Sequence, residues 1–351
     1  FRRVLFRSRM YIANATGCTS IWGNSSPSTP YTANKAGKGP AWSNSLFEDN
    51  AEFGYGMLLA QQAIRDGLKA KVEEVAANEN ATAEVKAACQ EWLDTFSVGA
   101  TNGVATDKLV AALENIDCPT CKDIVNNKDF LAKKSQWIFG GDGWAYDIGF
   151  NGVDHVLASG KDINIMVFNT EVYSNTGGQS SKATPTGAVA QFAAGGKEVK
   201  QKDLAAIAMS YGYVYVAQIS MGADMNQTIK AIAEAEAYPG PSLIIAYAPC
   251  INHGIKKGMA KAQTEEKLAV QSGYWNLFRF NPAAEGKKFS LDCKPATVDY
   301  QEFIKGEVRY TSLALKNPAR AEKLFAKAEQ NAKDKYAYLE KLVKLYDDNE
   351  Q

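Results

Sequence analysis

Apolar segments of strand length alternate with amphipathic segments of helix length through the second half of this chain. The strand-like segments cover 137–140, 163–169, 213–219 and 242–248, and the helix-like segments cover 145–158, 203–211 and 225–237. Strands that alternate with helices form parallel βαβ units, because a parallel connection is long enough to hold a helix. The pattern therefore predicts an α/β fold: an open, mostly parallel twisted sheet flanked by helices.

The segments outside this alternation differ from it in composition. The predicted division is a loop-rich start over 10–66, a helical insertion over 67–134, a core domain over 135–280, and a connector with a C-terminal helical extension over 281–351. The insertion is predicted because the sequence there is rich in Ala, Glu and Lys, and its apolar residues recur at helical spacing. Two further amphipathic stretches, 44–66 and 319–346, each predict one helix, the first capped near Ser45.

The first nine residues differ from the rest of the chain in charge. They contain four arginines and no acidic residue. Such a leader resembles a targeting peptide in composition, but it is too short to be one. We interpret residues 1–9 as a non-native scar.

Charge and hydropathy exclude several classes of protein. The formal net charge is zero, which argues against a nucleic-acid-binding surface. Residues 243–248 are among the longest apolar runs, far short of the roughly 20 residues of a membrane-spanning helix. Six cysteines in 351 residues do not indicate a disulfide scaffold. We expect a cytoplasmic protein that binds neither nucleic acid nor membrane.

Polar residues follow two of the predicted strands directly. Gly141-Asp142-Gly143 comes after the first strand, and a second polar loop with Thr170 and Val172 follows the next. The carboxyl ends of neighbouring parallel strands form a crevice that binds cofactors. Asp142, the Thr170 hydroxyl and the Val172 carbonyl would supply three hard oxygens to Mg²⁺, and diphosphate oxygens could complete the octahedron. The flanking glycines would let the backbone approach that diphosphate.

This combination is typical of a thiamin diphosphate site, but Gly-Asp-Gly is also ordinary turn chemistry. In the general thiamin diphosphate pattern the second loop has two asparagines, whereas this chain has Asn169 and Thr170. A threonine hydroxyl can replace an amide oxygen on Mg²⁺. Asp142 as a turn carboxylate is the alternative interpretation.

Several stretches carry a resemblance to a known family; they cover 14–18, 39–49, 140–150, 170–187, 211–216 and 247–254. From residue 14 to about residue 279 the chain resembles the C-terminal segment of pyruvate:ferredoxin (or flavodoxin) oxidoreductases, and it is similar to only the last third or so of such an enzyme. The resemblance implies a thiamin diphosphate-binding fold. It also implies an oxidoreductase of anaerobic metabolism that splits a 2-oxoacid, passes electrons through iron–sulfur clusters and transfers the acyl group to coenzyme A.

The resemblance also implies partners and site residues. The partners are pyruvate, coenzyme A, ferredoxin or flavodoxin, the missing N-terminal domains, which would supply a glutamate to the cofactor, and a second subunit in a homodimer. Asn175 would be catalytic, binding a substrate oxygen, although an Asx-turn is the alternative. The implied cofactor-binding residues are Cys18, Gly141, Asp142, Gly143, Trp144, Thr170, Glu171, Val172, Tyr173, Ser174 and Asn175.

Two cysteines match cluster ligands in that family. By the resemblance, Cys18 and Cys250 would be two of four thiolate ligands of a 4Fe–4S cluster, and the other two would lie upstream of this chain. Taken alone, each is more often a buried structural cysteine. His253, close to Cys250, is a candidate for a hydrogen bond that tunes the cluster.

A second cysteine pair, Cys118 and Cys121, has Cys-x-x-Cys spacing within the predicted insertion. We interpret it as a local pair, with cluster or zinc binding as the alternative, because no second such motif or nearby histidines accompany it.

Three other functions are compatible with parts of the sequence. A non-oxidative thiamin diphosphate-dependent decarboxylase or synthase would share the Gly-Asp-Gly loop but would not use the cluster cysteines. A nucleotide-binding dehydrogenase is disfavoured, because no Gly-x-Gly-x-x-Gly opens a βαβ unit. An inactive fragment is the third alternative.

Overall fold

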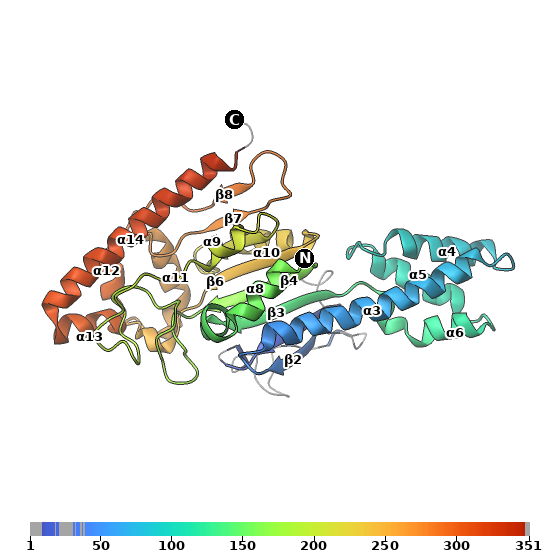
Figure 1. Ribbon diagram of the computed structural model, residues 1–351, viewed down its shortest axis with the longest axis horizontal. Helices are drawn as coiled ribbons and strands as arrows, with labels where there is room; N and C mark the ends of the chain where they lie inside the picture. Colours follow the sequence, from blue (N-terminus) through green and yellow to red (C-terminus); the bar gives the residue numbers. More distant parts are fainter. Residues whose placement is uncertain are drawn as a thin grey trace. The chain divides into compact units, whose positions relative to one another are not determined.

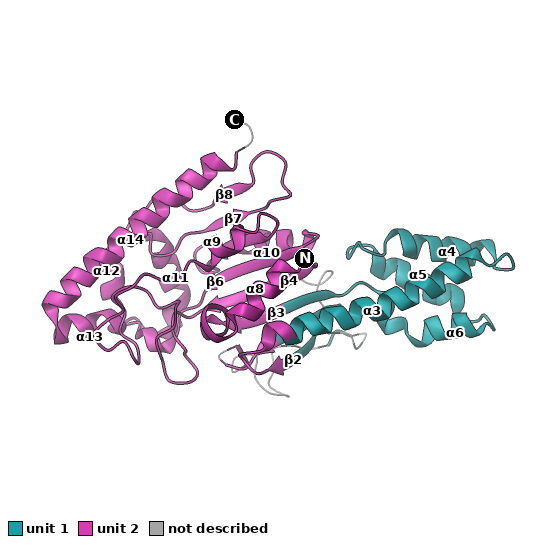
Figure 2. Ribbon diagram, viewed as in Figure 1, with its two compact units in different colours: residues 1–13, 30–43, 53–137 teal, residues 14–29, 44–52, 138–351 magenta. Residues whose placement is uncertain are grey.

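The computed structural model describes residues 9–17, 19, 20, 31, 33–35, 37 and 39–347 (Figure 1). Residues 1–8 of the predicted leader and the candidate ligand Cys18 lie outside this set. The chain forms two compact units (Figure 2): unit 1 contains Phe1–Ala13, Pro30–Ser43 and Phe53–Trp137, and unit 2 contains Asn14–Thr29, Asn44–Glu52 and Ile138–Gln351. The five-part division expected from the sequence stays a prediction. Among the described residues, no helix is long and apolar enough to cross a membrane.

The strands form one sheet with the order β2-β1-β3-β4-β6-β5-β7-β8. Strand β6 pairs in parallel with both β4 and β5, whereas β7 is antiparallel to β5 and to β8. Six of the seven residues are buried in β4 and likewise in β6, as expected for parallel strands covered on both faces. The predicted α/β fold class is confirmed. The strands are β1 (Met10–Ala15), β2 (Ala41–Ser45), β3 (Ser135–Gly141), β4 (Ile163–Asn169), β5 (Tyr215–Ile219), β6 (Pro241–Tyr247), β7 (Phe278–Phe280) and β8 (Phe289–Leu291).

Unit 2 contains the helices of the predicted core and of the C-terminal extension. Helices α8, α9 and α10 pack against β5 or β6, and α14 contacts α12, α13 and β8. The bounds are η1 (Gly143–Ile148, a π-helical turn), α8 (Phe150–Ala158), α9 (Leu204–Met209), α10 (Met225–Ala237), η2 (Ile251–His253), η3 (Met259–Lys261), α11 (Ala262–Gln271), α12 (Tyr300–Lys305), α13 (Val308–Lys316) and α14 (Pro318–Leu345). The predicted helix 319–346 is therefore present as α14.

The predicted helix 145–158 is two elements, η1 and α8, which meet at Gly149. Glycine is required where they meet, because a Cβ atom on Gly149 would lie 2.4 Å from the Trp144 ring. The first of the two elements is a π-helical turn, not part of a regular α-helix.

Unit 1 is mainly helical. It contains most of α3 (Asn50–Ala77), with α4 (Ala83–Asp94), α5 (Asn102–Leu113), α6 (Pro119–Asn126) and α7 (Lys128–Leu131). Its core residues recur at helical spacing and include Leu68, Val72, Val85, Cys89, Trp92, Leu109, Leu113, Cys121 and Ile124.

The predicted helix 44–66 is wrong at both ends, because α3 covers Asn50–Ala77. Ser45 is the last residue of strand β2, and its hydroxyl hydrogen-bonds to the Asp49 side chain just before the helix begins. At the other end, Leu68, Val72 and Val75 are buried and continue the apolar face of α3 for three more turns.

Candidate functional site

The loops that follow β3, β4 and β6 carry the predicted site residues of unit 2. Asn169 at the end of β4 pairs with Tyr247 at the end of β6, and the Ala248 amide donates to the Asn169 carbonyl over 3.0 Å. Asp142 follows β3, Thr170 follows β4 and Cys250 follows β6. The sheet order therefore brings these segments to one edge, where α/β proteins bind ligands.

Three oxygens predicted to bind Mg²⁺ lie together. The Thr170 hydroxyl oxygen is 2.7 Å from Asp142 Oδ1 and 3.1 Å from the Val172 carbonyl oxygen. Neighbouring ligands of an octahedral Mg²⁺ with bonds of about 2.0–2.1 Å are about 3 Å apart. The spacing of these oxygens fits such an ion, and the Ser174 hydroxyl lies 3.0 Å from the Thr170 oxygen.

The Asp142 carboxylate is buried without a cationic partner among the described residues. Its side chain is 1% exposed, and its second oxygen accepts a hydrogen bond from the Ser181 hydroxyl over 2.5 Å. Burial raises the pKa of Asp142 to about 7, although the hydrogen bonds from Ser181 and Thr170 act in the opposite direction. A buried carboxylate is normally paired or bound to a metal. The charge that this site lacks is one that Mg²⁺ would supply.

The glycines of this edge accommodate two aromatic side chains. A Cβ atom on Gly143 would lie 2.5 Å from the Tyr173 ring, whereas one on Gly141 would meet nothing closer than 3.9 Å. Trp144 is 1% exposed and packs against Gly140 and Gly149. Gly143 is therefore needed for close packing, while Gly141 leaves the backbone open on its outer side.

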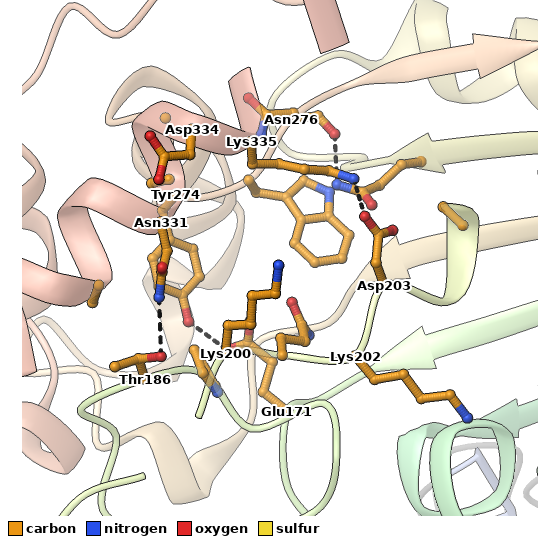
Figure 3. Close-up of a pocket in the computed structure, with 18 of the residues that line it drawn as sticks. Glu171, Thr186, Lys200, Lys202, Asp203, Tyr274, Asn276, Asn331, Asp334 and Lys335 are labelled. Atoms are coloured by element: carbon orange, nitrogen blue, oxygen red, sulfur yellow. Dashed lines mark hydrogen bonds and ion pairs between the residues drawn. The ribbon is translucent and has the colours of Figure 1, made fainter. Parts of the chain in front are cut away.

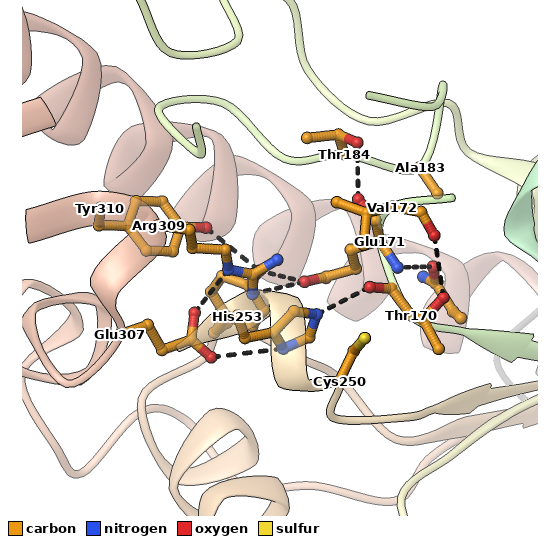
Figure 4. A network of polar contacts seen from close by, with 12 residues as sticks. Thr170, Glu171, Val172, Ala183, Thr184, Cys250, His253, Glu307, Arg309 and Tyr310 are labelled. Carbon is orange, nitrogen blue, oxygen red and sulfur yellow. Dashed lines mark hydrogen bonds and ion pairs between the residues drawn. The ribbon is translucent and has the colours of Figure 1, made fainter. Parts of the chain in front are cut away.

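Glu171 lies between the two predicted metal-binding residues of its loop and points the other way. Its φ is 60°, in the left-handed region, which costs a residue with a side chain about 1–3 kcal/mol. Its carboxylate is 2.7 Å from Arg309, and its carbonyl accepts a hydrogen bond from Thr184 over 2.6 Å (Figure 4). The carboxylate also accepts a hydrogen bond from the Tyr274 hydroxyl over 2.7 Å. Glu171 therefore anchors the loop.

His253 supports the same loop through its backbone. Its Nε2 lies 2.7 Å from the Thr170 carbonyl oxygen, and its Nδ1 lies 3.7 Å from Glu307 (Figure 4). Burial, and then the charge of Arg309, lower the pKa of His253 well below its usual value, so the ring is neutral. Because a carbonyl only accepts, Nε2 carries the proton. His253 thus contacts the Thr170 carbonyl through its ring and the Cys250 carbonyl through its backbone amide, which donates over 3.0 Å.

Cys250 is 8% exposed, and Asn252 connects it to the same loop. The backbone amide of Asn252 donates to the Cys250 sulfur over 3.4 Å, and the side-chain amide of Asn252 donates to the Ser174 carbonyl over 3.2 Å. Asn175 is exposed. The described part of the chain has no group of three or more His, Cys, Asp or Glu that could bind a metal. Cys18, the other candidate cluster ligand, lies outside the described residues.

Sequence reasoning missed Ser181, Tyr274, Asn252, Glu307 and Arg309. The serine follows a Gly-Gly turn, which is a weak indication of a loop that folds back. Each of the other four contacts a group of the site that lies at least 54 residues away, the shortest separation being that of Glu307 from His253, and no local pattern marks them.

Unit 2 contains a cavity of about 450 Å³, and the Glu171 side chain is part of its lining (Figure 3). Glu171 and Tyr274 line it, as do Lys200, Asn331 and Lys335, whereas Asp142, Thr170 and Val172 do not. Lys335 forms an ion pair with Asp203 there. The predicted metal ligands therefore lie outside this cavity.

Comparison with known proteins places the chain among relatives. Residues 128–246 match the family model "Thiamine pyrophosphate enzyme, C-terminal TPP binding domain". The pyruvate-flavodoxin oxidoreductase of Klebsiella pneumoniae is 54% identical over 97% of this chain and 29% of that protein. The pyruvate:ferredoxin oxidoreductase of Moorella thermoacetica is 55% identical over 97% of this chain and 30% of that protein. A mitochondrial pyruvate dehydrogenase (NADP(+)) of Euglena gracilis is 48% identical over 93% of this chain and 18% of that protein.

The chain thus spans less than a third of the length of these relatives. Over nearly its whole length it is similar to one segment of the pyruvate-flavodoxin and pyruvate:ferredoxin oxidoreductases, and within it residues 128–246 match the thiamine pyrophosphate-binding domain model.

Proposed function

We propose that this chain is the diphosphate- and Mg²⁺-binding part of a 2-oxoacid:ferredoxin or flavodoxin oxidoreductase that decarboxylates pyruvate oxidatively and forms acetyl-CoA. The observation that carries the proposal is the set of oxygens from Asp142, Thr170 and Val172 at the edge of the sheet. The names of the relatives support pyruvate as substrate and flavodoxin or ferredoxin as acceptor. Domains outside this chain, a homodimeric assembly and a cytoplasmic location belong to the same proposal.

The proposed site divides into residues that would hold the metal, backbone that would face the diphosphate, and side chains that support both. Asp142, Thr170 and Val172 would hold Mg²⁺, and the open backbone at Gly141 would face the diphosphate. Thiamin diphosphate, when bound, supplies the carbon centre that makes the decarboxylation of a 2-oxoacid possible. The chain's own residues bind and orient that group: Glu171 and His253 fix the metal loop, while Tyr173 and Trp144 fill the space beside it.

The direct test is a titration of the chain with thiamin diphosphate, with and without Mg²⁺, followed by calorimetry. We expect binding that requires the metal, because the diphosphate and the buried carboxylate are both anionic and need a cation between them. Binding of equal strength in the presence of a chelator would contradict the proposed ligand set.

Asn175 is proposed to hydrogen-bond a substrate oxygen, which its exposed position in the loop after Ser174 permits. In the intact enzyme, Asn175→Ala is expected to lower kcat/KM for pyruvate by about 10- to 100-fold, the usual effect of one lost hydrogen bond to a charged group. Cofactor affinity should fall by a smaller factor than kcat/KM, because Asn175 is an implied cofactor-binding residue but not a predicted metal ligand. Steady-state kinetics and cofactor titration separate the two, and an unchanged kcat/KM would contradict the assigned catalytic role.

Cys250 is proposed, with Cys18, as a ligand of a 4Fe–4S cluster completed by cysteines outside this chain. In the intact enzyme, Cys250→Ser is expected to abolish electron transfer to a viologen dye and to leave thiamin diphosphate binding in place. Serine keeps the size of the side chain, so the loop should fold as before. Retained viologen reduction in the variant would contradict the assignment of Cys250 as a cluster ligand. An unaltered enzyme that decarboxylates pyruvate without reducing viologen would favour the non-oxidative decarboxylase, which has no use for a cluster.

A further inference from the structure

Cys118 and Cys121 lie at the start of α6 in unit 1, and the proposed function uses neither. Cys118 is the N-cap residue, and Pro119 opens the helix. The Cys118 sulfur accepts a hydrogen bond from the Cys121 backbone amide, with a nitrogen-to-sulfur distance of 3.4 Å. Cys121 is the third residue of the helix, one turn after the N-cap, so both cysteines lie at the positive, N-terminal end of α6.

The two thiols differ in accessibility and acidity. Cys118 is partly exposed, whereas Cys121 is 3% exposed and belongs to the core of unit 1. Hydrogen bonds from the Cys121 thiol and backbone amide lower the pKa of Cys118, while burial raises the pKa of Cys121 to about 12. The thiolate is the reactive form of cysteine. Cys118 is therefore the accessible sulfur that can attack a substrate, and Cys121 is the buried one.

A metal site explains the pair less well. Zinc and iron–sulfur centres need four ligands, and the described residues offer no group of three or more His, Cys, Asp or Glu around these sulfurs. The nearby core residue Cys89 is fully buried, and burial raises the pKa of its thiol to about 11. The geometry favours chemistry between two sulfurs.

We propose that Cys118 and Cys121 form a redox-active dithiol that reduces low-molecular-weight disulfides. The Cys118 thiolate attacks one sulfur of the substrate disulfide, breaks the S–S bond and forms a mixed disulfide, and the released thiolate takes up a proton. The Cys121 thiol then loses its proton and attacks the Cys118 sulfur. An internal disulfide forms and the second thiol leaves. The protein loses two electrons and two protons, and the substrate disulfide becomes two thiols.

The test uses the 351-residue chain, reduced, freed of reductant and incubated at neutral pH with hydroxyethyl disulfide. Alkylation followed by peptide mass mapping reports the state of each cysteine. We expect a Cys118–Cys121 disulfide in the unaltered chain, a stable mixed disulfide on Cys118 in Cys121→Ser, and an unmodified Cys121 in Cys118→Ser. Serine is a favourable N-cap residue, so Cys118→Ser should preserve α6, and circular dichroism checks this.

A kinetic comparison adds an internal control. Cys293 is partly buried, and burial raises the pKa of its thiol, whereas the pKa of Cys118 is lowered, so Cys118 should react faster with iodoacetamide because more of it is thiolate. Equal rates would overturn the proposal, as would oxidation of Cys121 that persists in Cys118→Ser. Stoichiometric Zn²⁺ binding that protects both thiols and disappears in both variants would assign a metal site instead.

Discussion

Replacing Asp142 by asparagine is expected to weaken Mg²⁺-dependent binding of thiamin diphosphate by more than about 100-fold, because even residues that only support a metal ligand change affinity by 10- to 100-fold. The asparagine amide has one oxygen and no charge, whereas the carboxylate offers both oxygens at the Thr170 and Ser181 hydroxyls. Calorimetric titration of the chain with cofactor and Mg²⁺ measures the effect. An unchanged affinity would mean that the metal site is assigned wrongly.

Two controls separate the loss of a ligand from misfolding. In the folded, metal-free chain the pKa of Asp142 is raised to about 7, above the roughly 3.9 of an unfolded chain. The stability that its neutral form provides is present at low pH and is lost as the pH rises through about 7. Asparagine stays neutral, so above that pH the metal-free variant should melt no lower than the unaltered chain. The second control is Asp147→Asn, which removes the negative charge that pairs with the exposed Lys182 over 2.7 Å. This variant should bind the cofactor as tightly as the unaltered chain.

The central strands β4 and β6 were predictable because they are buried on both faces, whereas the largely exposed strand β2 was not predicted. The segment 163–169 is predicted with the bounds of β4, and 242–248 differs from β6 by one residue at each end. Helix α10 also begins and ends where the sequence places it, over Met225–Ala237. Continuous apolar runs bounded by polar turns leave few alternatives for such segments.

The ends of α3 and the break at Gly149 were not predictable from local pattern. Ser45 is a favourable N-cap residue by type, but tertiary pairing places it in β2. The need for glycine where η1 and α8 meet depends on where the Trp144 ring lies, which the sequence does not state. In both cases a contact made by the folded chain overrides a local preference.

Some residues of the candidate site could also be predicted from the sequence, and others could not. Asp142 and Thr170 come directly after predicted strands, and a parallel sheet brings such residues to one edge, so their contact could be expected. The residues that hold the loop in place could not. Arg309 lies on helix α13, after the predicted core domain 135–280, and the ion-pair partner near it in the sequence is Glu307. A single sequence contains no information that pairs it with Glu171.

Replacing Arg309 by methionine is expected to lower the free energy of unfolding by about 3–5 kcal/mol, the usual cost of removing one partner of a buried ion pair. The guanidinium lies 2.7 Å from Glu171 and 2.7 Å from Glu307, and all three side chains are at most 1% exposed. Burial alone would lower the pKa of Arg309, but Glu307, Tyr274 and Glu171 together raise it well above its usual value. Methionine fills most of the volume, so the main loss is the charge. Urea denaturation measures the effect.

The pH dependence of that loss distinguishes charge from packing. Without Arg309 the pKa of Glu307, already raised to about 7 by burial, rises further above the roughly 4.3 of an unfolded chain. A raised folded-state pKa gives stability that is complete at low pH and is lost as the pH rises. The deficit of Arg309→Met should therefore be largest above about pH 7 and shrink towards acid, whereas a packing defect would not change with pH.

The matched control for this substitution is Arg320→Met. Arg320 makes a pair of the same length, 2.7 Å, with Glu198, but its side chain is 37% exposed and that of Glu198 is 67% exposed. An exposed ion pair contributes little to stability because water screens it, so this variant should unfold almost like the unaltered chain. Arg309→Met should also weaken Mg²⁺-dependent cofactor binding, because Glu171 would no longer be held in its left-handed conformation between Thr170 and Val172. If the two arginine variants were equally stable, the buried network would not be what fixes the metal loop.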